Sequence, residues 1–372
     1  MQRDGAFIFE MQVDGKLVPI QQETLTLLYS ESVYGLAVYE LSCLSSEFAT
    51  WDKIVTQNDR INIRLRWGLE KTSGRVWSNW RSIVAENIKL TYLLSGVKVE
   101  ASGTCGGMKV MDICHKNVFC RRTISSMVRE IARQNGMKVD VVDTKDQYDF
   151  YQCTMKDGHF LYKLVPHAVD QTGVGGYRFF VRNGDTLVFR PPGLASAKLL
   201  GVFTNDPRQE GPGVVVVDQF TAEIRRVFQA DEDHGSVEVR GFNPLRKQSA
   251  VFNAREDTVQ YERLARNSYL PLPTTSSIRL SVQPDLGQSS PGNVREEATS
   301  RWSRNAQSLF RLYLRVPPII DAEVGQVMKM ISLDDRGRPH WTSGTWGIYE
   351  VVQEVRPNGT TSFLGMERRN WT

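Results

Sequence analysis

Four residues between positions 105 and 120 have side chains that bind metal ions in many proteins. They are Cys105, Cys114, His115 and Cys120. Structural zinc sites hold their ligands in short pairs, about two to five residues apart, whereas these cysteines are separated by nine and six residues. The five cysteines of the whole chain contain no C-x-x-C pair, which is typical of reduced thiols made in a cytosol. We therefore predict neither a metal nor another cofactor.

Other patterns that mark active sites are missing or incomplete. The sequence has no G-x-S-x-G, no H-E-x-x-H and no G-x-x-x-x-G-K-[ST]. The glycines at 173, 175 and 176 precede no predicted phosphate-binding helix, and the acidic run at 231–234 lacks the spacing of a calcium loop. Two carboxylates that come together only in the folded chain could still form an active site, but no feature of the sequence identifies such a pair. We predict no catalytic residues and no enzyme.

The composition is that of an ordinary folded protein with several compact units. The chain has 372 residues, of which 41% are hydrophobic and 24% charged, and its formal net charge is +4. That charge is too small to indicate direct nucleic-acid binding. No apolar stretch of about eighteen residues occurs, and the N-terminal residues do not resemble a signal peptide, so neither membrane insertion nor export is expected.

The first hundred residues read as β-structure. Short β-branched and aromatic runs alternate with turn residues, beginning with a hairpin at Asp14-Gly15, which predicts a barrel or sandwich over residues 1–106. In "RINIRLRW", apolar residues alternate with Arg60, Arg64 and Arg66. These arginines form either a solvated outer face or a subunit contact or channel wall.

A helical pattern interrupts the strands at residues 107–192. "TISSMVREIARQNG" predicts a helix capped by Thr123 and ended by Asn135-Gly136. A second helix is expected from Asp157 as its cap, kinked or ended early by Pro166. The hairpin "YRFFVRNGDTLVFRPP" follows, and together these elements predict a small α/β domain.

The remaining residues predict a second β-domain that is split in two. Strand-like runs occupy 193–247 and 309–372, while 248–308 is a polar, irregular insertion that ends in a helix capped by Asn293. "FRLYLRV" alternates like "RINIRLRW" and places Arg311 and Arg315 on one face. The similarity suggests two related β-units, and these arginines join the candidate subunit-contact or channel residues.

This order of elements resembles the central hub proteins of phage tails and baseplates. The family includes the baseplate hubs of contractile-tailed phages, the late-control D proteins and the hub part of type VI secretion spikes. The resemblance covers most of the chain and is most specific in "TISSMVREIARQNG", "DGHFLYKL" and "NGDTLVF", with "IYEVVQEV" near the end. Pro166 and the linker that follows it depart from the family pattern, which leaves the length of the second helix open.

The resemblance implies a β-rich α+β multidomain fold. Two tube-like β-barrel domains, the second one split, would be accompanied by the small α/β domain and the irregular insertion. Its implied function is mechanical: a homotrimer with two similar barrels per chain forms a pseudo-sixfold ring. Such a ring joins a sixfold tail tube to a threefold spike or tip and continues the DNA channel.

The resemblance also implies a set of partners and a location. The partners are the tail tube or distal tail protein, the spike or tip protein, baseplate wedge proteins and the tape measure protein, with DNA only passing through the lumen. The location is the tail baseplate of a virion made in the host bacterial cytoplasm. Alternatives are a tail-associated cell-wall hydrolase and the hub of a tailocin or type VI spike. The spike itself is expected to be a separate polypeptide.

Overall fold

The computed structural model describes most of the chain, and the statements below concern the residues that it describes. They are residues 6–33, 37–48, 51–52, 61–71, 74–107, 111–191, 197–211, 213–217, 219–224, 236–243, 248–254, 279–282, 294–295, 297–298, 310–357 and 359–368.

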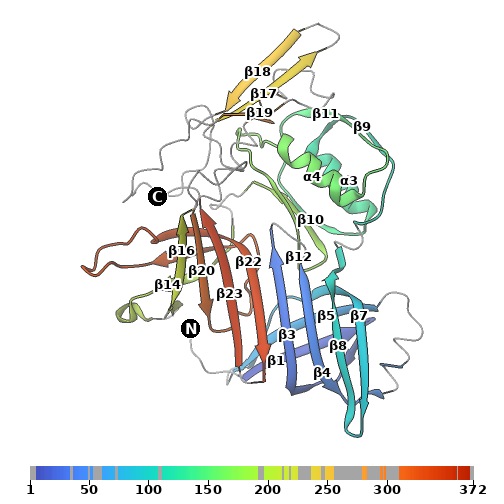
Figure 1. Ribbon diagram of the computed structural model, residues 1–372, viewed down its shortest axis with the longest axis vertical. Coiled ribbons are helices and arrows are strands. Elements are labelled where there is room, and N and C mark those ends of the chain that lie inside the picture. The colour runs from blue at the N-terminus through green and yellow to red at the C-terminus, as the bar shows by residue number, and fades with distance from the viewer. Residues whose placement is uncertain are drawn as a thin grey trace.

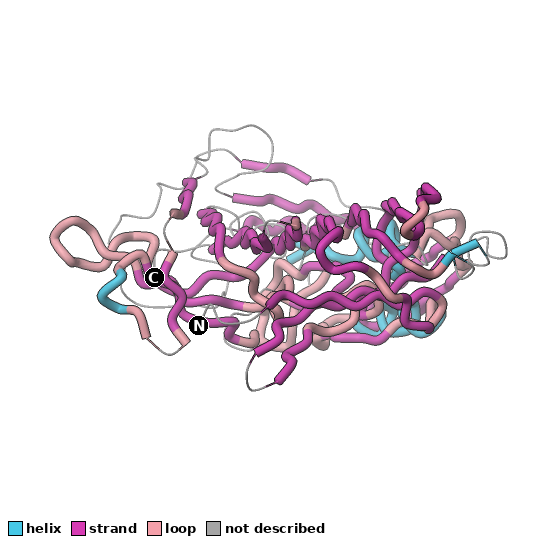
Figure 2. The backbone as a smooth tube through the Cα atoms, turned by 90° about the horizontal axis from the view of Figure 1, so that it is seen from below, coloured by secondary structure: helices cyan, strands magenta, loops and turns pink. Residues whose placement is uncertain are grey.

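Strands make up most of the described backbone, and the few helices are short (Figures 1 and 2). The first strands are β1 (Ala6–Val13), β2 (Lys16–Val18), β3 (Gln21–Ser32), β4 (Val38–Ser45), β5 (Ile61–Lys71), β6 (Gly74–Trp77), β7 (Arg81–Leu93) and β8 (Gly96–Cys105). The middle elements are β9 (Asn117–Thr123), α3 (Ile124–Gln134), β10 (Lys138–Val141), β11 (Gln147–Gln152), α4 (Asp157–Leu164), η1 (Val165–His167), β12 (Arg178–Arg182) and β13 (Thr186–Arg190). The last are β14 (Leu199–Thr204), η2 (Pro207–Gln209), β15 (Val214–Val216), β16 (Phe220–Ile224), β17 (Ser236–Asn243), β18 (Gln248–Ala254), β19 (Arg279–Val282), β20 (Phe310–Val316), β21 (Val327–Ile331), β22 (Gly344–Arg356) and β23 (Gly359–Arg368). No described helix is both long and apolar enough to cross a membrane.

Strands β1 to β8 form the first β-unit, a curled sheet around an apolar core. Its strands lie in the order β2-β1-β5-β7-β8-β4-β3, with β6 added to β5. The predicted hairpin at Asp14-Gly15 is present, because both residues have positive φ and join β1 to β2. The predicted alternation along β5 is also confirmed: Ile63, Leu65 and Trp67 are buried in the core.

The second β-unit is formed by β14 to β16 and β20 to β23. Its strands lie in the order β15-β14-β21-β22-β23-β20-β16. Alternation again sends one face inward, and the core contains Trp346, Phe310 and Met366. The two parts of this unit, β14–β16 and β20–β23, are far apart in sequence.

The two units have the same strand order. Read from its first strand, the first unit is β1-β5-β7-β8-β4-β3 and the second is β14-β21-β22-β23-β20-β16. The closing hairpins agree in detail, because β7 and β22 each have 13 residues and turn at glycines with matching backbones, φ +151° at Gly96 and φ +152° at Gly359. One difference is the first strand: β1 runs antiparallel to β5, whereas β14 runs parallel to β21.

This equivalence corrects the repeat suggested by the sequence. The alternating "RINIRLRW" and "FRLYLRV" segments are β5 and β20, but β5 corresponds to β21, and β20 corresponds to β4. Two related units are present, yet the two segments that suggested them do not occupy matching places. Alternation is a property of any half-buried strand and carries no information about its neighbours.

The units expected as tube-like β-barrel domains are curled sheets, and within the described residues neither closes into a complete hydrogen-bonded barrel. Each sheet is curled so that its two edge strands approach each other, and we call the gap between these edges the seam. The chain itself crosses the seam from one edge strand to the other. β2 ends at Val18 and β3 begins at Gln21, on the other side of the sheet; likewise β15 ends at Val216 and β16 begins at Phe220. A few residues reach only about 10–14 Å, so the two sides of each seam lie close together.

A side chain spans the seam of the first unit. The Gln22 amide accepts a hydrogen bond from the Phe9 backbone N–H (2.9 Å) and donates one to the Phe9 carbonyl (2.8 Å). It therefore replaces one pair of backbone hydrogen bonds where the strands have separated.

The two units merge through β3 and β22. Residues Glu350–Val355 of β22 pair antiparallel with Leu27–Ser32 of β3. One continuous antiparallel surface results, in the order β16-β20-β23-β22-β3-β4-β8-β7, with four strands from each unit. In Figure 1 this surface extends across the molecule, and β16 and β7 lie at opposite sides of it.

The α/β unit lies beyond one end of these sheets (Figure 1). Helix α3 begins and ends as predicted, because the Thr123 side chain accepts a hydrogen bond from the Ser126 backbone N–H and Gly136 has φ +64°. Its apolar stripe packs on α4 and on β13, which belongs to the sheet β10-β13-β12, while β9 pairs with β11. The predicted turn at Asn183-Gly184 joins β12 to β13.

The second helix ends early, as Pro166 predicted. Helix α4 stops at Leu164, and a single 3₁₀ turn containing Pro166 follows. Asp157 is the first residue of the helix rather than its cap, which is Lys156. The Asp157 carboxylate is instead buried among groups that donate hydrogen bonds to it, as described below.

A separate three-stranded sheet has the order β18-β17-β19. The sequence placed residues 236–243 with the second β-unit and left 248–292 irregular, but β17 pairs locally with β18, four residues further on, and with β19. A short connection favours such a hairpin. Of the predicted third helix, residues 294–295 and 297–298 are helical; most of it lies outside the described residues.

Candidate assembly surfaces

The cysteines that the sequence singled out do not form a site. Cys105 is buried in the core beside the α/β unit, whereas Cys114 and Cys120 are exposed. His115 contacts a carboxylate, that of Asp157, at 2.6 Å. Within the described part of the chain, no three histidine, cysteine or acidic side chains are placed to hold a metal.

The Asp157 carboxylate has a structural role. It is fully buried and accepts hydrogen bonds from the Gln152 side chain (2.6 Å), the Asn135 side chain (2.7 Å) and, as the tautomer allows, from His115 (2.6 Å). Buried carboxylates are tolerated where donors satisfy their oxygens. The contacts fix the start of α4 against the end of α3 and leave no vacant position for a reactant.

A second buried carboxylate, Glu31, lies where all three units meet. Only 1% of Glu31 is exposed; its oxygens accept hydrogen bonds from the Asn183 backbone N–H (3.1 Å) and from the Tyr29 hydroxyl (3.3 Å). Desolvation by burial raises the pKa of Glu31 to about 7, although the positive charge of nearby Arg81 lowers it. Glu31 thus links β3 of the first unit to the β12–β13 turn.

Arg81 is the cation of this junction. It is buried, lies over the Trp67 ring at 3.9 Å, and donates hydrogen bonds to the carbonyls of Asn79 (2.9 Å) and Ala322 (3.3 Å). Because Ala322 belongs to the second β-unit, Arg81 connects the two β-units directly. The sequence contains no signal for Glu31 or Arg81, since a single charge within a strand usually faces solvent.

The third contact of the junction is made through Glu323. Its carboxylate accepts hydrogen bonds from the side chains of Asn79 (2.7 Å) and Asn183 (2.9 Å), which come from the first unit and the α/β unit. The Asn183 carbonyl also accepts a hydrogen bond from the Ser82 backbone N–H (2.9 Å). These polar contacts join the three units at one junction.

The candidate arginines lie on two different surfaces. Arg60 lies outside the described residues. Arg64 is exposed and Arg66 half-buried on β5; the Arg66 guanidinium lies 4.4 Å from the Trp77 ring and 4.5 Å from the Trp80 ring, and pairs with Glu10. This Arg–Trp surface is outside the continuous eight-stranded surface, because β5 is not one of its strands.

The other two candidates, Arg311 and Arg315, do belong to the eight-stranded surface. Both project from β20, Arg311 toward the Tyr349 ring (5.3 Å) and Arg315 toward the Phe363 ring (5.6 Å). The structure thus separates the four described candidates into two pairs. It brings Arg64 and Arg66 together, and Arg311 and Arg315 together, on distinct faces.

The eight-stranded surface carries mixed charges. On β7 and β8, Glu100 pairs with both Lys89 (3.2 Å) and Lys98 (2.8 Å). On β22, Arg356 pairs with Glu354, and outward-facing acids also occur on β4 and β16. A surface that recognises nucleic acid would concentrate positive charge instead.

The hairpin tips of the two units differ in chemistry. Tyr92, Leu93 and Leu94 are exposed at the tip of β7–β8, and Phe48 stacks on Tyr92 with ring centroids 6.3 Å apart. The matching tip of β22–β23 carries Arg356 in place of Leu93. Exposed apolar groups of this kind commonly mark contact surfaces.

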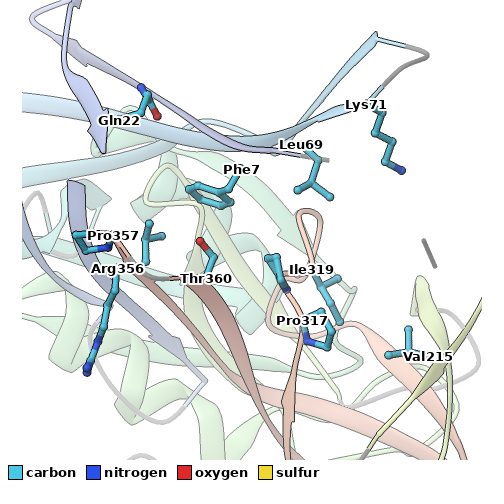
Figure 3. Close-up of a pocket in the computed structure, with 13 residues that line it drawn as sticks. Phe7, Gln22, Leu69, Lys71, Val215, Pro317, Ile319, Arg356, Pro357 and Thr360 are labelled. Atoms are coloured by element: carbon cyan, nitrogen blue, oxygen red, sulfur yellow. The ribbon is translucent and has the colours of Figure 1, made fainter. Parts of the chain in front are cut away.

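A pocket of about 390 Å³ lies between the two β-units (Figure 3). Phe7 and Leu69 come from the first unit, and Ile319 and Thr360 from the second. Its charged lining residues are Lys71 and Arg356, and no carboxylate, histidine or cysteine is among the described lining residues.

Comparison with solved structures identifies the fold. A tail protein from Neisseria meningitidis MC58 superposes with a TM-score of 0.63 at 10% sequence identity, covering 98% of this chain and 96% of that one. The 43 kDa tail protein of prophage MuSo2 from Shewanella oneidensis gives 0.61 at 10% identity, covering 98% and 99%. An E. coli protein described as a component of the type VI secretion system, similar to T4 bacteriophage tail proteins, gives 0.54 at 10% identity, covering 97% and 77%.

These likenesses define the class of fold. The chain has the β-rich multidomain fold of phage tail proteins and type VI spike proteins, which confirms at the level of the fold the resemblance seen in the sequence. No protein-family model and no curated protein matches the sequence itself.

Proposed function

We propose that the chain is a structural component of a phage-like tail. Three copies form a ring of six β-units that joins a sixfold tail tube to a threefold spike or tip. The observation that carries this proposal is the repeated strand order, because two units of one architecture in each chain make six from three copies. The fold shared with two tail proteins supports the same role.

In this proposal the α/β units form the threefold end of the ring. It occurs once per chain, between the two β-units, and projects beyond one end of them (Figure 1). A trimer would therefore present six β-units along its wall but three α/β units at that end. The division of the chain at about residues 106, 192, 247 and 308 is part of the proposal.

The candidate arginines take different roles in the ring. Arg311 and Arg315 line the eight-stranded surface, which we assign to the channel, where mixed charges let DNA pass without tight binding. Arg64 and Arg66 lie with Trp77 and Trp80 on the outer side, where arginine and tryptophan are typical of contact surfaces. The partners are the tail tube or distal tail protein, the spike or tip protein, the baseplate wedge proteins and the tape measure protein of the same virion.

The proposal is tested by the oligomeric state and symmetry of the purified full chain. Native mass spectrometry should give a particle of three 42.3 kDa chains, and electron microscopy should show a ring with a central channel and a wall of six similar lobes. A compact monomer or a twofold dimer at high protein concentration, or a solid particle, would refute it.

The enzyme alternative has its own test. Incubation of the purified chain with peptidoglycan should release no soluble fragments if the role is structural. Release of fragments would instead make the protein a tail-associated hydrolase and direct attention to carboxylates outside the pocket described above.

A further inference from the structure

We propose that the pocket between the two β-units binds a single acyl chain that ends in a carboxylate, as in a medium-chain fatty acid. The acyl chain lies against apolar side chains of both units, and its carboxylate pairs with Lys71 at one end of the pocket. The site is independent of the proposed ring, because every described lining residue belongs to one copy of the protein.

Two paired strands of the first unit form one wall of the pocket. Phe7 of β1 is directly opposite Leu69 of β5, and Lys71 is two residues further along β5, so all three share one face of the sheet. Figure 3 shows them in this order along one side of the pocket. Phe7 and Leu69 are half-buried at the margin of the first core, which leaves part of their apolar area for a ligand.

The second unit forms the opposite wall, and three of its lining residues are Pro317, Pro318 and Pro357. Proline has no backbone N–H and therefore offers no hydrogen-bond donor there. The N–H of Ile319, in the same wall, already donates to the Ser362 hydroxyl (2.9 Å). This wall suits a ligand with an apolar body better than a peptide, whose backbone carbonyls need donors when they are buried.

Uncharged polar side chains contribute little to the pocket. Within the described lining they are Gln22 and Thr360. The Gln22 amide already accepts a hydrogen bond from the Phe9 N–H (2.9 Å) and donates one to the Phe9 carbonyl (2.8 Å). An acyl chain needs no hydrogen-bond partner along its length, so this lining fits it.

The two positive charges of the pocket have different surroundings. Arg356 pairs with Glu354, and in Figure 3 its side chain extends away from the apolar lining residues. Lys71 is half-buried, and the adjacent acid on β5, Glu70, pairs with Arg75 (3.0 Å). No carboxylate is among the lining residues that the structure describes, so Lys71 supplies one positive charge for one anionic group.

Size and charge together select the class of ligand. The volume of about 390 Å³ is within the usual range for small-ligand pockets, about 300–1,000 Å³. The lysine ammonium is a point charge and lacks the planar fork with which arginine holds phosphate. A singly charged carboxylate on an apolar body matches both properties.

A ligand in this pocket would connect the two β-units. An acyl chain in contact with Leu69 and Ile319 removes apolar area of both units from water at once. Because it binds the folded protein and not the unfolded chain, it should also raise the melting temperature.

Isothermal titration calorimetry of the purified full chain, prepared without detergent, tests the proposal with hexanoate, octanoate and decanoate as probes. Affinity should rise by about fourfold for each added methylene, the ratio that corresponds to burying one CH₂ group. Decan-1-ol, which has the apolar body without the charge, should bind more weakly than decanoate. Absence of decanoate binding at millimolar concentration would overturn the proposal.

Substitution of Lys71 tests the position of the carboxylate. Lys71→Met should weaken decanoate binding by up to about fivefold and leave decan-1-ol binding unchanged, because only the ion pair is lost. Lys71→Arg, which keeps the charge, should retain most of the affinity. Lys16→Met, at an exposed position on β2, is the matched control and should bind like the wild type. An equal loss for decanoate and decan-1-ol in Lys71→Met would contradict the assigned ion pair.

Two filled variants test whether the pocket is the site. Leu69→Trp and Val215→Phe enlarge lining residues of different units, and each variant that retains cooperative thermal unfolding should lose decanoate binding. Binding that persists in a folded variant of this kind places the ligand elsewhere and overturns the proposal. Tighter binding of the peptide acetyl-Gly-Leu-Leu, with a free terminal carboxylate, than of decanoate would also overturn it, in favour of the C-terminus of a protein. None of these outcomes depends on whether the protein forms the trimeric ring.

Discussion

Replacing Glu31 with glutamine should make the protein more stable at neutral and alkaline pH. Glu31 is buried where the three units meet, and its pKa is raised from 4.5 to about 7, chiefly by desolvation. In the unfolded chain the carboxyl loses its proton near pH 4.5. Between these two pH values the folded protein binds more protons than the unfolded chain, so the free energy of unfolding falls as the pH rises.

The size of the effect follows from the two pKa values. A carboxyl with a pKa of 4.5 unfolded and about 7 folded contributes about 3 kcal/mol that is fully present below pH 4.5 and lost by about pH 8. The carbonyl of glutamine can accept the hydrogen bond from the Asn183 N–H, and its NH₂ group can donate one to the Tyr29 hydroxyl oxygen, without any charge. Glu31→Gln should therefore match the wild type near pH 4.5 and exceed it by as much as about 3 kcal/mol near pH 8.

The measurement is urea unfolding, followed by tryptophan fluorescence at several pH values from 4.5 to 8. The quantity compared is the difference in unfolding free energy between variant and wild type, because other groups also titrate in this range. Glu40→Gln, at an exposed position, should show no such pH-dependent difference. A constant difference between Glu31→Gln and the wild type across the range would show that Glu31 stays charged, and would refute the reasoning.

Three further substitutions test the packing of the fold. Gly184→Ala should cost about 1–3 kcal/mol, because Gly184 has φ +73° and a Cβ there would overlap the backbone carbonyl of Ser82; a loss below 0.5 kcal/mol by urea unfolding would contradict that close approach. Thr123→Ala should cost about 1 kcal/mol by removing the cap of α3, and Thr123→Ser should retain most of the stability. Trp346→Ala should cost about 3–5 kcal/mol, since this ring is fully buried in the second unit, and a shift in melting temperature no larger than that of an exposed tryptophan variant would count against it.

Local features of the fold were predictable from the sequence because their causes are local. Asp14-Gly15 and Asn183-Gly184 specify tight turns through positive φ, and Pro166 ends a helix wherever it occurs. The two helices and the hairpin of the α/β unit were predicted from signals of this kind. These elements needed no knowledge of distant residues.

The pairing between distant strands was not predictable in this way. The matched hairpins β7–β8 and β22–β23 share their turn glycines, Gly96 and Gly359, and no other residue at equivalent positions. Strand pairing depends on which face is buried and where the neighbours lie, which many sequences satisfy equally well. The repeat was therefore suggested by two strands that do not correspond.

The candidate site shows the same division. The sequence correctly placed Arg64, Arg66, Arg311 and Arg315 on outward strand faces, because alternation determines the face. It gave no reason to separate them into two surfaces, since that depends on which strands join the eight-stranded surface. Glu31 was overlooked because its burial results from contacts made by all three units.

The differing hairpin tips would make the two kinds of β-unit chemically distinguishable to a partner that binds the end of the proposed ring. Two building blocks of one shape alternate around it, and one ends in exposed leucines where the other ends in an arginine and a proline. A sixfold partner with six identical binding sites would meet the two kinds of hairpin tip in alternation. A threefold partner could bind in only one rotational orientation in which each of its sites meets the kind of tip it prefers. Side-chain differences between two units with the same strand order would thus reduce the sixfold symmetry of the end of the ring to threefold symmetry and fix the orientation of a threefold partner.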